Sequence, residues 1–315
     1  MRRPTGTGRV SVIIPTHNRA QLLPRAIGSV LRQTAAEVCD IVVVDDGSTD
    51  ATAAVVARYG RAVRLLRQEH AGAAAARNAG IRATDGEFVA FLDSDDEWAP
   101  DKIAAQLAAL ARWPEAVFVA GASVARYPDR EEPRVTDAVP HDVPADFAPA
   151  LCAGNFLFTP TVLVRRTALD AVGLFCPALR RRHDYHLWVR LACHGRGIYL
   201  SRLLAWFAVG AAGSLSAARE EALLAELDAR RRLRTLLARR PECRLPWRRA
   251  VAGYLRSLRD RAYARGDYAA AARYAVELLR EAPEWPAAWE WRRLVSCVAR
   301  MVWAPRAAGD KGGGR

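Results

Sequence analysis

The chain has 315 residues, enough for one large domain or two modest ones. Hydrophobic residues make up 51% of it and charged residues 26%, a balance that excludes an intrinsically disordered chain. The net charge of +13 lies mainly in residues 216–315, which carry 22 basic and 12 acidic side chains. No nucleic-acid-binding motif accompanies this excess, so we expect no nucleic-acid partner.

The first third of the chain alternates short apolar runs with segments of helical periodicity. Apolar strands separated by helices predict a mostly parallel sheet that helices cover on both faces. We expect strands at 10–14, 41–44, 63–66 and 88–92, and helices at 21–33, 49–59, 71–83 and 100–112.

The remaining residues divide into a mixed segment and a helical one. Residues 127–150 are rich in Pro, Asp and Glu, which predicts a mobile loop. The next elements are predicted as a strand at 161–164, a helix at 184–193 and strands at 198–200 and 203–209. From residue 216 the pattern is helical, and residues 254–283 resemble one tetratricopeptide-like hairpin. We therefore predict two domains, 1–215 and 216–315.

The sequence also predicts a location. The longest apolar runs, 154–164 and 203–213, are too short for a transmembrane helix. The N-terminus has arginines but no apolar segment, which predicts no secretory signal. Six cysteines occur without a C-x-x-C pair, as is typical of free thiols in a reducing compartment. We expect a cytoplasmic protein.

Polar clusters follow three of the predicted strands, at residues 15–18, 45–50 and 93–96. Because the carboxyl ends of parallel strands meet at one edge of a sheet, where ligands bind, we expect these clusters to gather there. In the second cluster, Asp45 would accept the N3–H of a uracil or thymine ring. The alternative is a turn at Asp45 with Ser48 or Thr49 capping the next helix.

The third cluster, Asp-Ser-Asp-Asp at 93–96, predicts a cation site. Carboxylates this close repel one another unless a cation neutralises them, and Mg²⁺ or Mn²⁺ is held by one or two carboxylates together with substrate phosphates. In an extended segment Asp93 and Asp95, two residues apart, would face the same way. The alternative is a solvated acidic turn before the next helix.

Several motifs occur in order: VSVIIPTHNR, DIVVVDDGSTDAT, ARNAGIRATDGEFVAFLDSDDEWAPDKI, GNFLFTPTVLVRR and HDYHLWVRLACHGRG. Over roughly residues 9–205 the chain resembles the inverting family 2 glycosyltransferases. The resemblance implies an α/β, Rossmann-like GT-A fold, here with an all-helical C-terminal appendage. It also implies transfer of a sugar from a nucleoside-diphosphate sugar, such as a UDP-sugar, to an acceptor hydroxyl on a glycan or lipid-linked precursor.

The resemblance assigns roles to residues that match the family's motifs. Asp184 would be the catalytic base, with His183 standing where the family usually has Glu. Asp95 and Asp93 would bind the divalent metal, Mg²⁺ or Mn²⁺. The nucleotide-binding residues would be Pro15, Thr16, Asp45, Arg77 and Asp93.

The sequence also leaves alternatives to this function and to these roles. Relatives often carry an Arg and a His after the last strand to hold the diphosphate, but residues 206–216 contain neither. Either another cation substitutes, such as one of the arginines at 180–182, or diphosphate binding is weakened. The missing residues also favour the alternative of a degenerate sugar-nucleotide-binding or partner-binding protein of the same fold. A nucleotidyltransferase is a further rival, although residues 15–19 form no Gly-rich loop. Asp184 as a helix N-cap is the simpler alternative to the base.

The basic C-terminal third also holds five of the nine tryptophans, at positions 247, 285, 289, 291 and 303. Arg and Trp together suit the headgroup zone of an anionic bilayer, with residues 285–303 as an imperfectly amphipathic helix. We therefore expect a peripheral contact at the inner membrane face. The alternative is that these tryptophans pack the helical region together.

Overall fold

The computed structural model describes residues 8–209, 219–238, 247–281, 292 and 295–300. The chain divides into two compact units. The first comprises Met1–Ala218 and Thr235–Leu245, and the second comprises Arg219–Arg234 and Pro246–Arg315. The first unit therefore continues three residues beyond the predicted boundary at residue 215. It also includes Thr235–Leu245, which the prediction assigned to the second domain.

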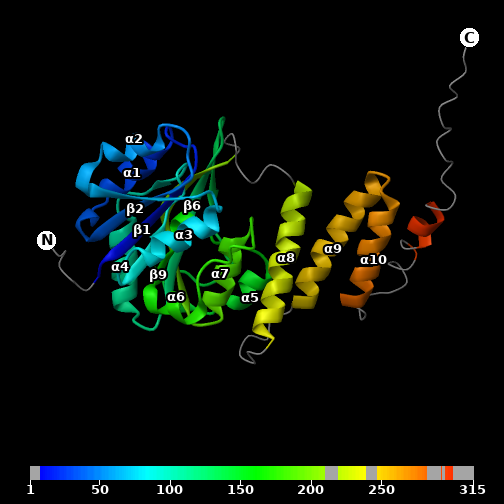
Figure 1. Ribbon diagram of the computed structural model, residues 1–315. Helices are drawn as coiled ribbons and strands as arrows, with labels where there is room; N and C mark the ends of the chain where they lie inside the picture. Colours follow the sequence, from blue (N-terminus) through cyan, green and yellow to red (C-terminus); the bar gives the residue numbers. More distant parts are fainter. Residues whose placement is uncertain (1–7, 210–218, 239–246, 282–291, 293–294, 301–315) are drawn as a thin grey trace, which may run out of the picture. The chain divides into compact units, whose positions relative to one another are not determined.

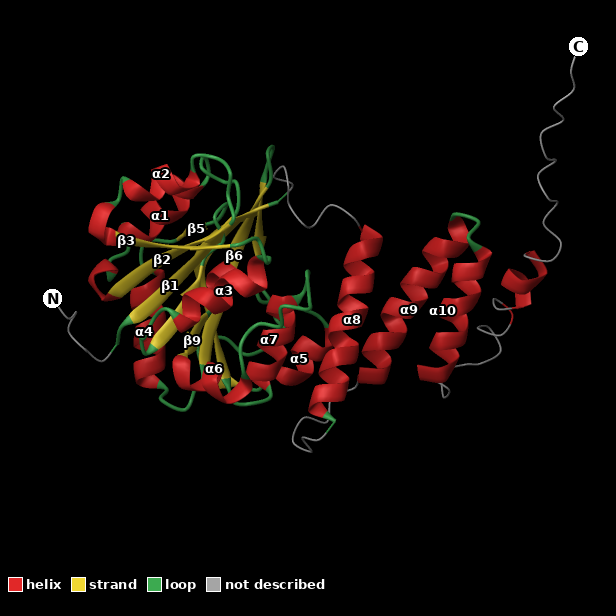
Figure 2. Cartoon of the chain, in the orientation of Figure 1, coloured by secondary structure: helices red, strands yellow, loops and turns green. Residues whose placement is uncertain are grey.

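A ten-stranded sheet forms the centre of the first unit (Figures 1 and 2). Its main order is β3-β2-β1-β4-β9-β6-β10-β5, with β7 paired to β6 and β8 paired to β10. Strands β1 to β4 are mutually parallel, and β9 runs antiparallel to both of its neighbours. The strands are β1 (Val10–Thr16), β2 (Cys39–Asp46), β3 (Val63–Gln68), β4 (Phe88–Phe91), β5 (Glu97–Trp98), β6 (Phe118–Arg126), β7 (Glu131–Arg134), β8 (Pro144–Ala145), β9 (Leu163–Arg165) and β10 (Gly197–Ala208).

Helices cover both faces of this sheet, as the continuous apolar strands predict. The helices of the first unit are α1 (Leu23–Leu31), α2 (Thr52–Ala57), α3 (Ala73–Arg82), α4 (Lys102–Arg112), α5 (Ala148–Ala153), α6 (Arg166–Val172) and α7 (His183–Ala192), with short 3₁₀ turns at Ala36–Val38, Gly60–Ala62 and Thr159–Thr161. Apolar side chains of α1, α2 and α4 share one buried core with alternate residues of the strands. Helix α3 packs on the opposite face, where a Cβ at Gly80 would lie 2.5 Å from Ile13.

Two expectations for this unit are wrong. The segment 127–150, predicted as a mobile loop, contains β7, β8 and the start of α5. The strands predicted at 198–200 and 203–209 form one strand, β10, whose pairing with β6 shifts register at Leu200/Leu203 and again at Leu203/Ala205. A β-bulge of this kind interrupts the apolar alternation on which a prediction of strands depends.

The second unit is helical in its described part, as predicted. Helix α9 (Trp247–Ala264) and helix α10 (Tyr268–Glu281) form the expected hairpin around the left-handed Gly266 (φ +78°). The turn is held by Asp267, whose Oδ1 accepts the backbone N–H of Ala270 at 3.0 Å. Helix α8 (Arg219–Leu237) begins in this unit and adds Leu227 to its apolar core.

Among the described helices, none combines the length and apolar character needed to cross a membrane.

Candidate active site

The predicted polar clusters lie at the carboxyl ends of neighbouring parallel strands. Thr16, the last residue of β1, is in register with Asp45 on β2, and Asp46 is in register with Gln68 on β3. Pro15 and Thr16 are both buried. The Thr16 hydroxyl has no hydrogen-bond partner among the described residues. A buried hydroxyl without a partner is costly, which makes it a candidate for contact with a ligand.

Asp45 is fully buried and its carboxylate is already engaged. Its Oδ1 accepts the backbone N–H of Ser48 at 2.8 Å, and its Oδ2 lies 3.1 Å from Nε of Arg67. The predicted contact with a base would therefore have to replace or share the Arg67 partner. The Ser48 or Thr49 cap does not form: α2 begins at Thr52, and the Asp50 carboxylate accepts the Thr52 N–H at 3.0 Å.

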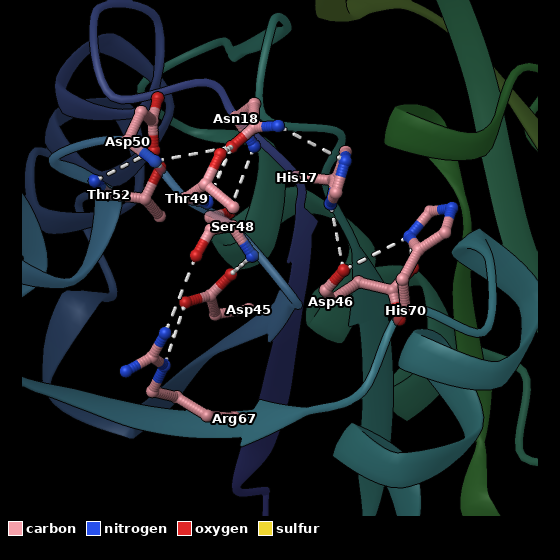
Figure 3. Close-up of polar contacts among 10 residues, drawn as sticks. All are labelled: His17, Asn18, Asp45, Asp46, Ser48, Thr49, Asp50, Thr52, Arg67 and His70. Carbon is pink, nitrogen blue, oxygen red and sulfur yellow. Dashed lines mark hydrogen bonds and ion pairs between the residues drawn. The ribbon is translucent and has the colours of Figure 1, made fainter.

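Asp46, which the sequence did not single out, holds the loop between β3 and α3. Its carboxylate accepts backbone N–H groups of Ala71 at 2.9 Å and Gly72 at 2.8 Å, and the Gln68 amide at 2.6 Å. Burial raises the pKa of Asp46, but these hydrogen bonds outweigh it and hold the pKa below its usual range. Figure 3 shows Asp45 pointing toward Arg67 and Asp46 lying beside His70, as alternation along a strand requires.

Two histidines lie beside Asp46, with ring centroids 4.3 Å apart. The Asn18 amide oxygen accepts the Thr49 N–H at 2.8 Å, so its nitrogen faces Nε2 of His17 at 3.2 Å (Figure 3). Nε2 is therefore the acceptor, and Nδ1–H of His17 donates to the Asp46 carbonyl at 2.8 Å. Nδ1 of His70 lies 3.0 Å from the Asp46 carboxylate.

The acidic segment 93–96 is a turn, closed by a 3.0 Å hydrogen bond from the Asp96 N–H to the Asp93 carbonyl. The premise of an extended segment is therefore wrong, and the three carboxylates have different partners. Asp93 pairs with Arg77, Asp95 lies 3.7 Å from Arg19, and Asp96 accepts the backbone N–H of Ala208 at 3.0 Å. Nowhere in the described ranges do three or more His, Cys, Asp or Glu side chains form a group that could hold a metal.

The electrostatics of this turn nevertheless suit a cation. The side chains of Asp93 and Asp95 are 32% and 21% exposed, so an ion can reach both carboxylates. Burial, followed by the charge of Asp93, raises the pKa of Asp95. Burial and the charges of both neighbours raise the pKa of Asp96 well above its usual value. A divalent cation at Asp95 would relieve this repulsion, with its other ligands coming from substrate oxygens and water.

Arg77 on α3 connects this acidic turn to the start of α7. One end of its guanidinium donates to Asp93, and NH1 donates to Nε2 of His183 at 2.6 Å. Arg77 also lies over the Phe175 ring, 5.5 Å from its centroid. Residues from two predicted motifs, up to 106 positions apart, therefore meet at one guanidinium.

Asp184 lies in the first turn of α7, next to His183. The helix begins at His183, and no side-chain hydrogen bond caps it within the described part of the chain. The simple N-cap reading of Asp184 therefore has no support. The Thr159 hydroxyl lies 3.5 Å from Oδ2 of Asp184. The preceding residue, Arg182, is left-handed (φ +61°), an uncommon conformation for a side chain of this size.

The end of β10 closes the site on another side. Ala208 bonds to Asp96, and the neighbouring Phe207 stacks on Phe158 with centroids 4.4 Å apart. Residues 210–216, where the diphosphate-binding Arg and His are missing, lie outside the described residues. Of the arginines at 180–182 proposed to substitute, Arg182 immediately precedes α7.

Comparison with known sequences identifies one family. Residues 11–183, more than half of the chain, match the model described as Glycosyl transferase family 2. Over 100 residues the chain is 41% identical to UDP-Glc:alpha-D-GlcNAc-diphosphoundecaprenol beta-1,3-glucosyltransferase WfgD of Escherichia coli, a match that covers 31% of this chain and 39% of that protein. The chain spans between 17% and 60% of the length of eight curated relatives that it matches.

Solved structures show the same fold at low sequence identity. S. aureus TarS 1-349 in complex with UDP-GlcNAc aligns with a TM-score of 0.68 at 17% identity, covering 92% of this chain and 89% of that one. The mannosyltransferase PcManGT of Pyrobaculum calidifontis, solved with GDP-Man and Mn²⁺, aligns with a TM-score of 0.56 at 23% identity, covering 96% and 91%. The sheet and its helices thus have the expected GT-A fold, and the family match shows that the chain belongs to glycosyltransferase family 2.

Proposed function

We propose that this family 2 glycosyltransferase is an inverting, metal-assisted enzyme that moves a sugar from a nucleoside-diphosphate sugar to an acceptor hydroxyl. One observation carries the proposal. Arg77 bridges Asp93, on the side predicted to bind the donor, and His183, the neighbour of the predicted base Asp184. This contact supports the proposal, because the residues expected to hold a sugar nucleotide and to deprotonate an acceptor would then share one site.

In the proposed reaction the acceptor oxygen attacks the anomeric carbon from the side opposite the diphosphate. The new C–O bond forms as the bond from the anomeric carbon to the phosphate oxygen breaks, and the departing nucleoside diphosphate keeps the electron pair. The carboxylate of Asp184 takes the hydroxyl proton during the attack. One displacement inverts the configuration of the sugar.

Other residues of the chain would bind and orient the donor. Pro15, Thr16, Asp45 and Arg77 would hold the nucleotide; the buried Thr16 hydroxyl and Arg77 Nε, which have no protein partner in the described residues, are open for such contacts. Asp95 and Asp93 would hold a Mg²⁺ or Mn²⁺ ion, which supplies positive charge opposite the departing diphosphate.

The donor and acceptor classes follow by analogy with the relatives. WfgD is named for UDP-Glc and a diphosphoundecaprenol-linked sugar, and TarS was solved with UDP-GlcNAc. We therefore propose a UDP-sugar donor and a glycan or lipid-linked acceptor of polysaccharide biosynthesis.

A lipid-linked acceptor would place the protein in the cytoplasm, at the inner membrane face. Four of the five C-terminal tryptophans lie outside the described residues, and the fifth, Trp247, is 7% exposed and so belongs to a core. Val295 and Val298, which are 63% and 45% exposed in the last described helical segment, are apolar surface that a bilayer would cover.

The test combines nucleotide binding with one substitution. Thermal shift with UDP, GDP and dTDP, each with and without Mn²⁺, should show a higher melting temperature with one diphosphate. Activity is then measured with a sugar donor of the diphosphate that binds. Asp184→Asn should still bind the nucleotide, while transfer or donor hydrolysis falls by roughly 10²–10⁴-fold, the usual effect of a positioned base.

Two results would oppose the proposal. Turnover retained in Asp184→Asn would refute the assignment of the base. Binding of a diphosphate without any transfer or hydrolysis by the wild-type protein would favour the degenerate binding protein, which the missing Arg and His at 206–216 also suggest.

A further inference from the structure

His183 is held in one protonation state by its contact with Arg77. The imidazole is 7% exposed, and its Nε2 lies 2.6 Å from Arg77 NH1. A guanidinium carries donors and no acceptor, so Nε2 must accept and the ring proton must be on Nδ1. His183 is therefore neutral in this arrangement. Burial, followed by the charge of Arg77, lowers the pKa of His183 to about 4, which agrees with the hydrogen bond.

Arg77 has two different acceptors, and one of its three guanidinium nitrogens has none among the described residues. It is 4% exposed; Asp93 accepts from one terminal nitrogen and neutral His183 from the other. The Phe175 ring lies under the guanidinium, 5.5 Å away at its centroid. Nε of Arg77 is buried and has no hydrogen-bond partner in the described part of the protein. The side chain is thus fixed in place, and Nε is the one guanidinium nitrogen without an acceptor in the described part of the protein.

The charges of these three residues add up to zero. Arg77 contributes one positive charge and Asp93 one negative charge, and His183 adds none. A carboxylate at position 183 would hold the guanidinium equally well but would make the group net negative. A nucleoside diphosphate is an anion, so its binding beside Arg77 depends on that difference.

We propose that His183 is a positioning residue: as a neutral acceptor it orients Arg77 without adding a second negative charge to that of Asp93, so that the group facing the donor's nucleoside diphosphate is neutral and not negative. This inference rests on the proposed function. It separates two properties that a carboxylate at position 183 would combine, the orientation of the guanidinium and the addition of a negative charge beside it.

The experiment compares a neutral with a charged acceptor at position 183. Binding of UDP, GDP and dTDP is measured by calorimetry for wild type, His183→Gln and His183→Glu. His183→Gln should bind within about threefold of wild type, because an amide oxygen still accepts from Arg77. His183→Glu should bind about tenfold to a hundredfold more weakly, the effect of one charged hydrogen bond.

A matched control separates this local effect from a general change in charge. His194→Glu adds the same charge just beyond the C-terminal end of α7, at an exposed position. It should bind the diphosphate as wild type does. Equal affinities of His183→Gln and His183→Glu, each with a wild-type circular dichroism spectrum, would overturn the proposal.

A second measurement uses the wild-type protein alone, so it does not depend on whether a variant folds. Long-range ¹⁵N–¹H NMR of the wild-type protein at pH 7 should show His183 with a proton on Nδ1 and none on Nε2. A doubly protonated ring, or a proton on Nε2, would refute the inference. If the wild-type protein binds none of the three diphosphates, the proposed function fails as well, whereas equal binding by the two variants overturns the inference alone.

Discussion

Lys102 offers a direct test of the packing of the first unit, because it is a lysine with no exposed surface. Its Nζ donates to Oε1 of Gln106 at 2.7 Å and lies 4.1 Å from the centroid of the Trp98 ring. Burial lowers the pKa of Lys102 from 10.5 to about 7. At 1.36 kcal/mol for each pKa unit, keeping this amine protonated in the folded state costs up to about 5 kcal/mol.

The sign of the pH dependence follows from the two pKa values. The unfolded chain binds the proton up to about pH 10.5 and the folded chain only up to about pH 7, so the free energy of unfolding rises with pH between these limits. Below pH 7 the full penalty applies. From pH 7 to 8.5 the wild-type protein should gain up to about 2 kcal/mol from this one group.

The assay is urea unfolding followed by circular dichroism at several pH values from 7 to 8.5. Lys102→Met, always neutral, and Lys102→Arg, always charged, should both lose this part of the pH slope. The slope is a better measure than stability at one pH, because Lys102→Met leaves Oε1 of Gln106 without its donor, at a cost of about 1–3 kcal/mol.

The thiol of Cys39 changes the free energy of unfolding with pH in the opposite direction, and it sets the upper limit of the pH range used. Burial raises the pKa of Cys39 from 9.0 to about 12, so its contribution to stability falls as pH rises above 9. Repeating the series in a Cys39→Ala background removes this contribution. Parallel curves for wild type and Lys102→Met between pH 7 and 8.5 would show that Lys102 is not buried as a neutral amine.

Three further predictions follow. Asp95→Asn should abolish Mn²⁺-dependent nucleotide binding by calorimetry and leave the fold intact, while the exposed Asp129→Asn has no effect; unchanged binding by Asp95→Asn would remove that residue from the cation site. Gly47→Ala should lower the free energy of unfolding by about 1–2 kcal/mol, because Gly47 is left-handed (φ +81°) and its Cβ would lie 3.0 Å from the His70 backbone N. In contrast, Gly253→Ala in α9, where a Cβ has open space, should raise it by about 0.5–1 kcal/mol. The protein should sediment with anionic vesicles, and this binding should require the residues after about 284 and weaken as salt is added. If equal amounts of protein sediment with anionic and with neutral vesicles, the proposed contact with an anionic membrane is excluded.

The sequence predicted the elements whose stability comes from apolar burial. The runs at 10–14 and 41–44 became β1 and β2, because strands buried on both faces are apolar at every position. The position of Asp93 after β4 also follows from the polarity of a parallel sheet, whereas Arg77, which lies inside α3, was assigned to the site only through the family resemblance.

Features that depend on polar pairing and not on an apolar pattern were missed. Strand β7 reads Glu-Glu-Pro-Arg and carries no apolar signal. Its backbone pairs with β6, and Glu131 accepts from Arg126 at 2.7 Å across the pair. Lys102 was missed for a similar reason, because a lone lysine at the start of an amphipathic helix is usually exposed. Its burial depends on Trp98 and Gln106 packing around the amine.

The adjacent carboxylates Asp45 and Asp46 show how far strand geometry alone could have refined the site. Both are in a continuous buried strand, so hydropathy treats them alike. Alternation along the strand, however, requires one to face Ser48 and Arg67 and the other to face the loop before α3. Asp46 accepts two backbone N–H groups from that loop, so a ligand that replaced these hydrogen bonds would release the loop. The Arg67 partner of Asp45, in contrast, is 58% exposed and can exchange with solvent or a ligand. The Arg67 end of this ion pair is exposed and the Asp45 end is fully buried, so a base that replaced Arg67 would also have to supply the hydrogen bond that the buried carboxylate loses.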